Sequence, residues 1–279
     1  MVAIQNKQLF YKVTSISFIT ITALSVIGFG TFGRHPELLA QFPWATEIYG
    51  KAYSMFAQGH TIIAFLTAVA LLFRYVEFKW LKAFAATYLI SFMAEFGGTS
   101  IGIPFGHYQY SSLLGPKIFD HVPFIIPTSW FTMAIMAYGT AYYFFRDHRG
   151  LRVLFGAMMI TAWDFALDPA MSYTASYWTW STPGAFFGMP IFNPIGWMIT
   201  GATIIFAMDL LKTHQWISKV PLKHQLFVYI LNAFLPFAML LVSGVWEAAL
   251  ISAFVIGGVL FLMKFVSDRR PHSLSFESI

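Results

Sequence analysis

Long apolar segments recur along the whole chain, and they restrict what it can fold into. Eight stretches of about 20 residues are nearly free of charge, and this is the length at which an α-helix crosses a bilayer. The predicted spans cover residues 13–33, 56–76, 80–101, 122–145, 150–170, 193–211, 223–243 and 245–267. We expect an all-α, polytopic membrane helix bundle of about eight transmembrane helices, forming a single integral membrane domain over residues 1–279.

The composition agrees with a membrane protein. Hydrophobic residues make up 58% of the chain and charged residues only 10%, whereas soluble domains carry about 25% charged residues. No cysteine is present, which excludes disulfides, thiolate ligands and cysteine nucleophiles. The formal charge of +5 is better explained by basic cytoplasmic loops than by nucleic-acid binding, so we expect no nucleic-acid partner.

The distribution of Lys and Arg predicts the orientation of the spans. With eight spans, 14 of these residues fall on one side and only Arg34, Lys51 and Lys117 on the other, and an odd number of spans would remove this asymmetry. Because basic residues concentrate in cytoplasmic loops, both termini are predicted to be cytoplasmic, in a multi-pass protein of the cell membrane. The basic side is made up of Lys7, Lys12, Arg74, Lys79, Lys82, Arg146, Arg149, Arg152, Lys212, Lys219, Lys223, Lys264, Arg269 and Arg270.

Two carboxylates near the end of the fifth span are the strongest candidates for chemistry. Asp164 and Asp168 are four residues apart and therefore share one helix face. Ionisable groups at membrane depth are costly and usually functional. Burial favours a protonated carboxyl, and repulsion between two such groups leaves one as an acid and its neighbour as a base. The alternative interpretation is that Asp168 only caps the loop where Asp-Pro ends the helix.

The predicted orientation places further polar residues near the same, non-cytoplasmic face. Glu95 lies deep in the third span, while His60 and Asn193 begin the second and sixth spans from that side. A buried glutamate needs a partner or a proton, and structural pairing with His60 or His107 is the alternative to catalysis. Asp209 and Lys212, at the other end of the sixth span, are interpreted as interface charges.

The two long outer connections, 102–121 and 171–192, are rich in Gly, Pro and aromatic residues, which is typical of packed caps over a cavity. Tyr108 and Tyr110 are candidate hydrogen-bond donors. The faces of aromatic rings attract cations, so they could line a site where a carbocation forms. Anchoring at the membrane interface is the competing explanation. The ring candidates are Trp163, Trp178, Trp180 and Trp197.

The histidines give little support for a metal centre. None of them lies three or four residues from another, as in the histidine clusters of membrane di-iron enzymes. We therefore predict no metal and no cofactor, although His60, Glu95 and His107 could form a mononuclear site. The Walker phosphate-binding motif and the zinc-protease motif are absent from the sequence.

Three blocks of sequence together carry a family resemblance. They are EFGGTSIGIPFGHYQYSSLLGPKIFDHVPFIIPTSW, then AWDFALDPAM, then YWTW followed by GMPIFNPIGW. In order and spacing they resemble the carotenoid biosynthesis membrane protein family that contains the CruF-type carotenoid 1,2-hydratases. The resemblance covers a core at about residues 85–200.

The resemblance implies a hydro-lyase that adds water across the terminal C1,C2 double bond of an acyclic carotenoid, without a redox cofactor. Lycopene, gamma-carotene or a C50 bacterioruberin precursor would be the substrate, entering from the lipid bilayer. The alternatives are another carotenoid enzyme, such as an isomerase or a metal-dependent oxygenase, or a non-catalytic carotenoid binder or transporter. Association with other carotenoid enzymes is a further possible partnership.

Combined with that chemistry, the residues suggest a division of labour. Asp164 would donate the proton to C2, and Asp168 or Glu95 would orient the attacking water. Asn193 would hold this water, while Trp163, Trp178 or Tyr108 would shield the cation. The full set of predicted substrate-binding residues is His60, His107, Tyr108, Trp163, Trp178, Trp180, Asn193 and Trp197.

Overall fold

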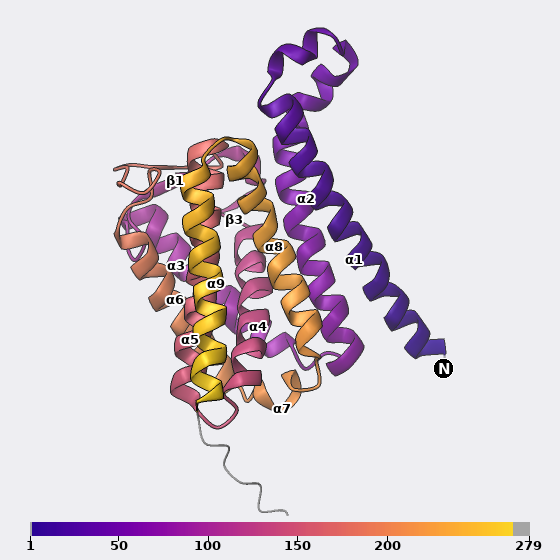
Figure 1. The fold of residues 1–279 in the computed structure, drawn as a ribbon, viewed down its shortest axis with the longest axis vertical. Helices are drawn as coiled ribbons and strands as arrows, with labels where there is room; N and C mark the ends of the chain where they lie inside the picture. Colours follow the sequence, from indigo (N-terminus) through magenta and orange to yellow (C-terminus); the bar gives the residue numbers. More distant parts are fainter. Residues whose placement is uncertain (1, 270–279) are drawn as a thin grey trace, which may run out of the picture.

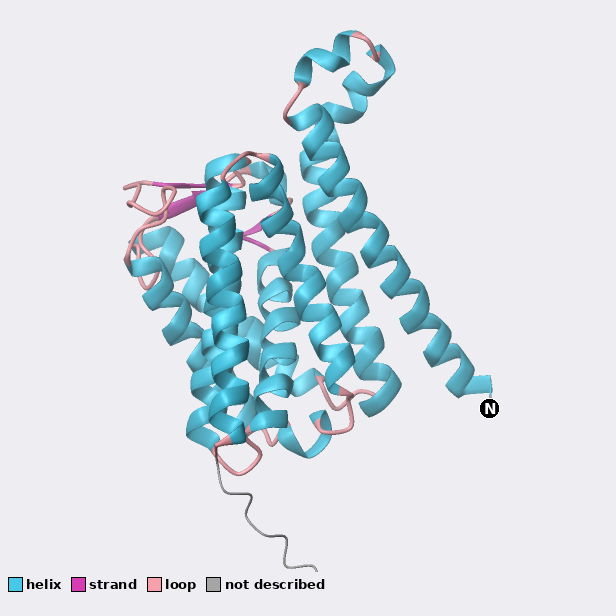
Figure 2. Ribbon diagram, in the orientation of Figure 1, coloured by secondary structure: helices cyan, strands magenta, loops and turns pink. Residues whose placement is uncertain are grey.

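The computed structural model describes residues 2–269 and is built almost entirely of α-helix (Figure 1, Figure 2). Eight helices of 19 or more residues within this range coincide with the eight predicted spans, which confirms the expected fold class. They are α1 (Val2–Gly28), α2 (Pro43–Val76), α3 (Leu81–Ile101), α4 (Ile125–Phe144), α5 (Arg149–Asp168), α6 (Phe192–Leu210), α8 (Leu222–Val242) and α9 (Trp246–Asp268). Within the described residues, five helical segments are long and apolar enough to cross a membrane: Gln5–Gly33, Pro43–Val76, Arg149–Thr174, Leu222–Val242 and Trp246–Asp268.

Short elements fill the connections between these helices. Most of them lie in the outer loops predicted from the sequence, and α7 (His214–Ile217) is a single turn between α6 and α8. The others are η1 (Phe29–Gly33), η2 (Pro36–Ala40), β1 (Tyr108–Tyr110), η3 (Ser112–Leu114), β2 (Lys117–Ile118), β3 (Val122–Pro123), η4 (Pro169–Thr174) and β4 (Trp178–Trp180).

Helix α4 forms the centre of the bundle. Its residues from Trp130 to Ala141 are all buried, and it packs against α2, α3, α5 and α8. The outer helices instead expose large apolar side chains, such as Phe254 on α9 and Ile27 on α1. An apolar surface of this kind is suited to lipid contact. The polarity is therefore that of a membrane bundle, apolar on the outside as well as in the core.

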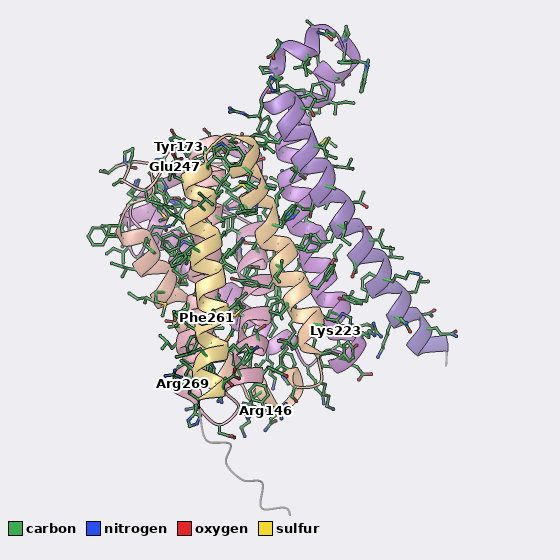
Figure 3. The ribbon with its side chains drawn as sticks, viewed as in Figure 1. Arg146, Tyr173, Lys223, Glu247, Phe261 and Arg269 are labelled. Carbon is green, nitrogen blue, oxygen red and sulfur yellow. The ribbon has the colours of Figure 1, made fainter. Side chains whose placement is uncertain are left out.

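The two ends of the bundle differ in character. The start of α1 and the end of α9 lie at the same end (Figure 1), so the chain crosses the bundle an even number of times. Arg146, Lys223 and Arg269 are also at this end, whereas Tyr173 and Glu247 are at the opposite one (Figure 3). That the basic end is cytoplasmic stays a prediction, and Arg270, counted with the basic residues, lies outside the described range.

The sequence predicted that Asp209 is a charge at the membrane interface, and the structure shows that this prediction is wrong. Its side chain is buried, and its carboxylate accepts hydrogen bonds from Arg149 Nε at 2.6 Å, Arg152 Nη2 at 2.9 Å and the Tyr138 hydroxyl at 2.9 Å. The arginines begin α5 and the tyrosine lies on α4, so the ion pair ties three helices together. These partners are about 60–70 residues away in the sequence, so the sequence around Asp209 alone could not predict the ion pair.

At the opposite end, a small antiparallel sheet joins the two long connections. Strand β1 pairs with β4, with Tyr108 opposite Trp180 and Tyr110 opposite Trp178. Alternate residues of a strand point to the same side, so both tyrosines and both tryptophans face one side of the sheet. Gln109 and Thr179, between them, are exposed. This sheet closes the end of the bundle over the carboxylates described next.

Candidate active site

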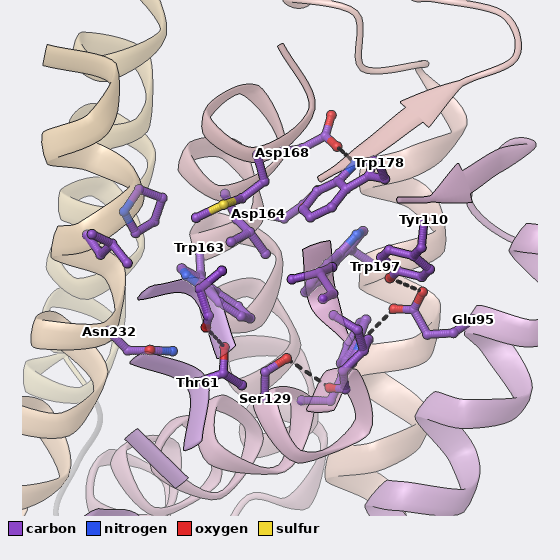
Figure 4. A pocket seen from close by; sticks show the side chains of 18 of the residues that line it. Thr61, Glu95, Tyr110, Ser129, Trp163, Asp164, Asp168, Trp178, Trp197 and Asn232 are labelled. Atoms are coloured by element: carbon purple, nitrogen blue, oxygen red, sulfur yellow. Dashed lines mark hydrogen bonds between the residues drawn. The ribbon is translucent and has the colours of Figure 1, made fainter. Parts of the chain in front are cut away.

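A cavity of about 90 Å³ lies among α2, α3, α4, α5, α6 and α8, next to the β1–β4 sheet. The structure brings ten of the eleven predicted site residues to its wall. We refer to this space as the acid cavity, because Glu95, Asp164 and Asp168 all line it (Figure 4). The other predicted residues at the wall are His60, Tyr108, Trp163, Trp178, Trp180, Asn193 and Trp197.

Glu95 is held by three hydrogen-bond donors. Its Oε2 accepts from the hydroxyls of Tyr108 and Tyr110, the latter at 2.7 Å, and its Oε1 accepts from Trp130 Nε1 at 2.7 Å. Both tyrosines come from β1, where their i, i+2 spacing directs them to the same carboxylate. Both oxygens of Glu95 are thus engaged by the protein.

Tyr108 and Tyr110 stay neutral donors over the ordinary pH range. Both phenols are fully buried, and burial raises their pKa well above the usual value, with the adjacent Glu95 carboxylate raising it further. Desolvation and a neighbouring negative charge both disfavour a phenolate. The contacts to Glu95 are therefore permanent donor contacts.

Asp168 is held in the same manner by the second strand. Trp178 Nε1 donates to Oδ1 at 2.7 Å, and Trp180 Nε1 lies 3.2 Å from each of the two oxygens. The two indoles are again an i, i+2 pair, this time on β4. Oδ2 has only the longer Trp180 contact, which leaves it room for a further donor such as water.

Asp164 differs from the other two carboxyl groups because one of its oxygens is free. It is buried, with 1% of its surface exposed, and Oδ2 accepts from Asn193 Nδ2 at 2.5 Å. Oδ1 has no hydrogen-bond partner, and the same holds for His60 Nε2 and Trp163 Nε1. Buried polar atoms are nearly always paired. Three unpaired atoms on the wall of one cavity therefore indicate a place for a polar ligand or water, and a single water needs only about 10–15 Å³.

Aromatic rings make up much of the remaining wall. Trp130 and Trp197 stack with 4.1 Å between ring centres and 19° between planes, and Trp163 meets Trp197 edge-on at 5.7 Å. Tyr108 lies 4.9 Å from Trp180. Stacked and edge-on pairs of this kind fix ring orientation. The cavity therefore combines acidic groups with rigid π surfaces, and none of the described residues that line it is a Lys or Arg.

His107 is the predicted residue that lies apart from the cavity. It is exposed, and its Nδ1 lies 2.6 Å from Ser181 Oγ on the outer side of the sheet. In β1 it precedes Tyr108 by one residue, so its side chain points to the opposite side. Within residues 2–269, no three His, Asp or Glu side chains are grouped as metal ligands, so His60, Glu95 and His107 do not converge.

Trp130 and Asn232 are among the wall residues that sequence reasoning missed. Trp130 looked like an ordinary core residue of the fourth span, yet it donates to Glu95. Asn232 of α8 also lines the cavity, on the side away from Glu95 (Figure 4). An amide in the middle of an apolar span was an available signal, since polar groups are costly at that depth.

Comparison with known proteins adds two findings. A family model described as carotenoid biosynthesis protein matches residues 56–259. Bisanhydrobacterioruberin hydratase of Haloarcula japonica is 26% identical to the chain over 200 residues, which are 71% of this chain and 66% of that relative. The chain thus spans just under two thirds of the relative's length. No solved structure matches the chain.

Proposed function

This chain belongs to the carotenoid biosynthesis protein family, and we propose that it is a hydratase of that family. It adds water across the terminal C1,C2 double bond of an acyclic carotenoid end group and leaves a tertiary alcohol at C1. Its substrate is lycopene, gamma-carotene or a C50 precursor. The relative named as a hydratase supports the reaction type. The unpaired Asp164 Oδ1 inside an aromatic cavity is the observation that carries the proposal.

The first step is protonation of the alkene. The Asp164 carboxyl gives its proton to C2, so a C2–H bond forms while the π bond breaks and C1 becomes a tertiary cation. A positioned general acid of this kind typically contributes about 10²–10⁴-fold to a rate. Asn193 holds Oδ2, and Oδ1, which has no hydrogen-bond partner, is the oxygen that would carry the proton.

The cation at C1 is stabilised by its surroundings. The rings of Trp163 and Trp197 present π faces and edges to the cavity, and ring faces attract cations. Glu95 accepts three hydrogen bonds and contributes negative potential in a site that excludes bulk water. Fixed charges and dipoles of this kind stabilise a developing charge without reorganisation during the reaction.

Water then completes the addition. Its oxygen attacks C1 and one of its protons passes to Asp168, whose Oδ2 has room for this contact. Asp168 lies one helical turn from Asp164, so transfer of this proton to Asp164 restores the starting state. The net change is one water added to one alkene, and no electrons leave the substrate.

Pigment analysis tests the proposal directly. The unaltered chain, expressed in a bacterium that makes lycopene or gamma-carotene, should yield pigments with a tertiary hydroxyl group. Asp164→Asn should lower this conversion about 10²-fold or more, because it removes the acid. Glu247→Gln is the matched control, since Glu247 is exposed at the same end of the bundle and outside the cavity (Figure 3).

Two results would contradict the proposal. Unchanged pigment with the intact, folded chain would reject the hydratase function and favour a carotenoid binder or transporter. Full conversion by Asp164→Asn would remove Asp164 from the mechanism.

A further inference from the structure

A second cavity adjoins the acid cavity on the side of α1. It measures about 460 Å³ and lies between the end of α1 with η1, the start of α2, and α8 with η4. We call it the apolar groove. Gly28, Trp44, Ala52 and Tyr53 are among its lining residues.

The apolar groove and the acid cavity share part of their walls. Ala57 of α2, Met171 of η4 and Leu235 of α8 line both spaces. At these positions the two spaces are therefore separated by a single layer of side chains. A ligand that reaches from the acid cavity into the apolar groove must therefore displace the side chains of Met171 and Leu235, which lie between the two spaces.

The chemistry of the apolar groove restricts its occupant. None of the described residues that line it is charged, and their few polar side-chain atoms are the indole nitrogen of Trp44 and hydroxyls such as those of Ser25 and Tyr49. Lipid-facing side chains border it, including the exposed Ile27 and Ile48. A long hydrocarbon is matched to such a lining, and a charged or hydrogen-bonding ligand is not.

The volumes of the two spaces suit different parts of one ligand. Ligand cavities usually measure about 300–1,000 Å³. The acid cavity, at about 90 Å³, falls well below this range, while the apolar groove, at about 460 Å³, falls within it. The acid cavity can hold the reacting end group and a water, and the remaining chain must lie elsewhere.

We propose that the apolar groove binds the conjugated chain of the substrate while its terminal double bond lies at Asp164. This inference rests on the proposed function and extends it to how the substrate is held and enters. The carotenoid enters from the lipid between the outer ends of α1 and α2. Its end group then passes Ala57, Met171 and Leu235 to reach Asp164. No bond changes in the apolar groove.

Bulky substitutions in the walls test the proposal. Gly28 has no atom within 4 Å of an added Cβ and has helical backbone angles, so the backbone at this position accepts a side chain and Gly28→Trp adds a bulky ring to the groove wall. Ala52→Trp narrows the apolar groove from α2 and guards against failure of the first variant. Gly50→Trp is the matched control, because Gly50 also has no atom within 4 Å of an added Cβ and does not line the groove.

Two substrates separate the groove from the catalytic chemistry. One is a full-length acyclic carotenoid, and the other is a short acyclic terpene with the same terminal end group. Gly28→Trp and Ala52→Trp should lower kcat/KM for the long substrate at least tenfold and leave the short one within twofold. Bound pigment per purified protein should fall in parallel, and Gly50→Trp should match the unaltered chain.

The outcomes distinguish failure of this inference from failure of the proposed function. Equal loss for both substrates, or no loss of pigment binding in either variant, would overturn the groove assignment. A change in oligomeric state without loss of binding would instead make the groove a contact between copies and would also overturn it. If the unaltered protein binds pigment but never hydrates it, the hydratase function is rejected. The groove assignment is then decided by whether Gly28→Trp and Ala52→Trp lower the amount of bound pigment.

Discussion

Three carboxyl groups line one cavity, but each has different neighbours. Glu95 has two phenols and an indole, and Asp168 has two indoles. Asp164 has one amide and a free oxygen. Because a proton donor must be able to reach its substrate, only the Asp164 environment suits the acid. The strands β1 and β4 keep the other two carboxylates in place as acceptors.

Asp168→Asn should slow hydration by about 10²-fold, because it removes the base that takes a proton from the attacking water. Trp178 and Trp180 can still donate to the amide oxygen, so pigment binding should be retained. The measurement is product formed per bound pigment, beside Glu95→Gln. Normal turnover by Asp168→Asn together with an inactive Glu95→Gln would transfer the base role to Glu95.

At the residue scale, sequence reasoning identified ten residues that line the acid cavity, because costly residues stand out in an apolar chain. Asp164, Asp168 and Glu95 were conspicuous for that reason. The indole of Trp130 was not, because tryptophan is equally at home in a core. Which oxygen is unpaired depends on the rotamers and neighbours of folded helices, and no spacing rule supplies it.

At the scale of elements, the two ends of the bundle are fixed by different means. The β1–β4 sheet joins the two outer connections, while the ion pair of Asp209 with Arg149 and Arg152 ties α5 to α6 at the other end. Breaking a buried pair leaves an uncompensated charge, which costs more than the intact pair contributes. The packing of α5 against α6 at the basic end therefore relies on Asp209.

Asp209→Asn should destabilise the protein strongly. Loss of one partner of a buried ion pair typically costs about 3–5 kcal/mol, and we expect the lower end because Arg149 is 54% exposed. Thermal unfolding in detergent should show a clear fall in midpoint. Asp147→Asn, at an exposed site in the α4–α5 connection, is the control, and equal midpoints for both variants would contradict the structural role.

Sequence reasoning located the long helices better than the short strands. Spans were found because about 20 apolar residues are needed to cross a bilayer. Their ends were less accurate: α2 begins at Pro43 and not near residue 56, since a helix can continue beyond the apolar layer with its backbone bonds satisfied internally. The pairing of β1 with β4 joins segments about 70 residues apart, and strands of three residues give no periodic signal.

At the scale of the whole molecule, polarity is arranged along the bundle axis. Basic side chains mark the end where α1 starts (Figure 1, Figure 3). The acid cavity lies next to the β1–β4 sheet, at the other end. The family match extends over residues 56–259, beyond the expected core of about 85–200. It thus includes His60 of α2 and Asn232 of α8, which complete the wall of the cavity.

Cysteine labelling can establish the orientation, because the chain has no native cysteine. With the basic end in the cytoplasm, Glu47→Cys should react in intact cells with a membrane-impermeant maleimide. Asp147→Cys should react only after the cells are permeabilised. Both positions are exposed. Glu47 lies near the start of α2 and Asp147 follows Arg146 in the α4–α5 connection, and these segments are at opposite ends of the bundle (Figure 1, Figure 3). The reverse pattern would invert the predicted topology.

The narrowness of the acid cavity has a consequence for molecules whose two termini are alike. Under the proposed function, a space of about 90 Å³ accepts one terminus at a time, and the far terminus stays many carbons away. Such a molecule must depart, turn end for end in the lipid and return before its other half can react. Modification would then be distributive, and singly altered pigment would accumulate ahead of the doubly altered form.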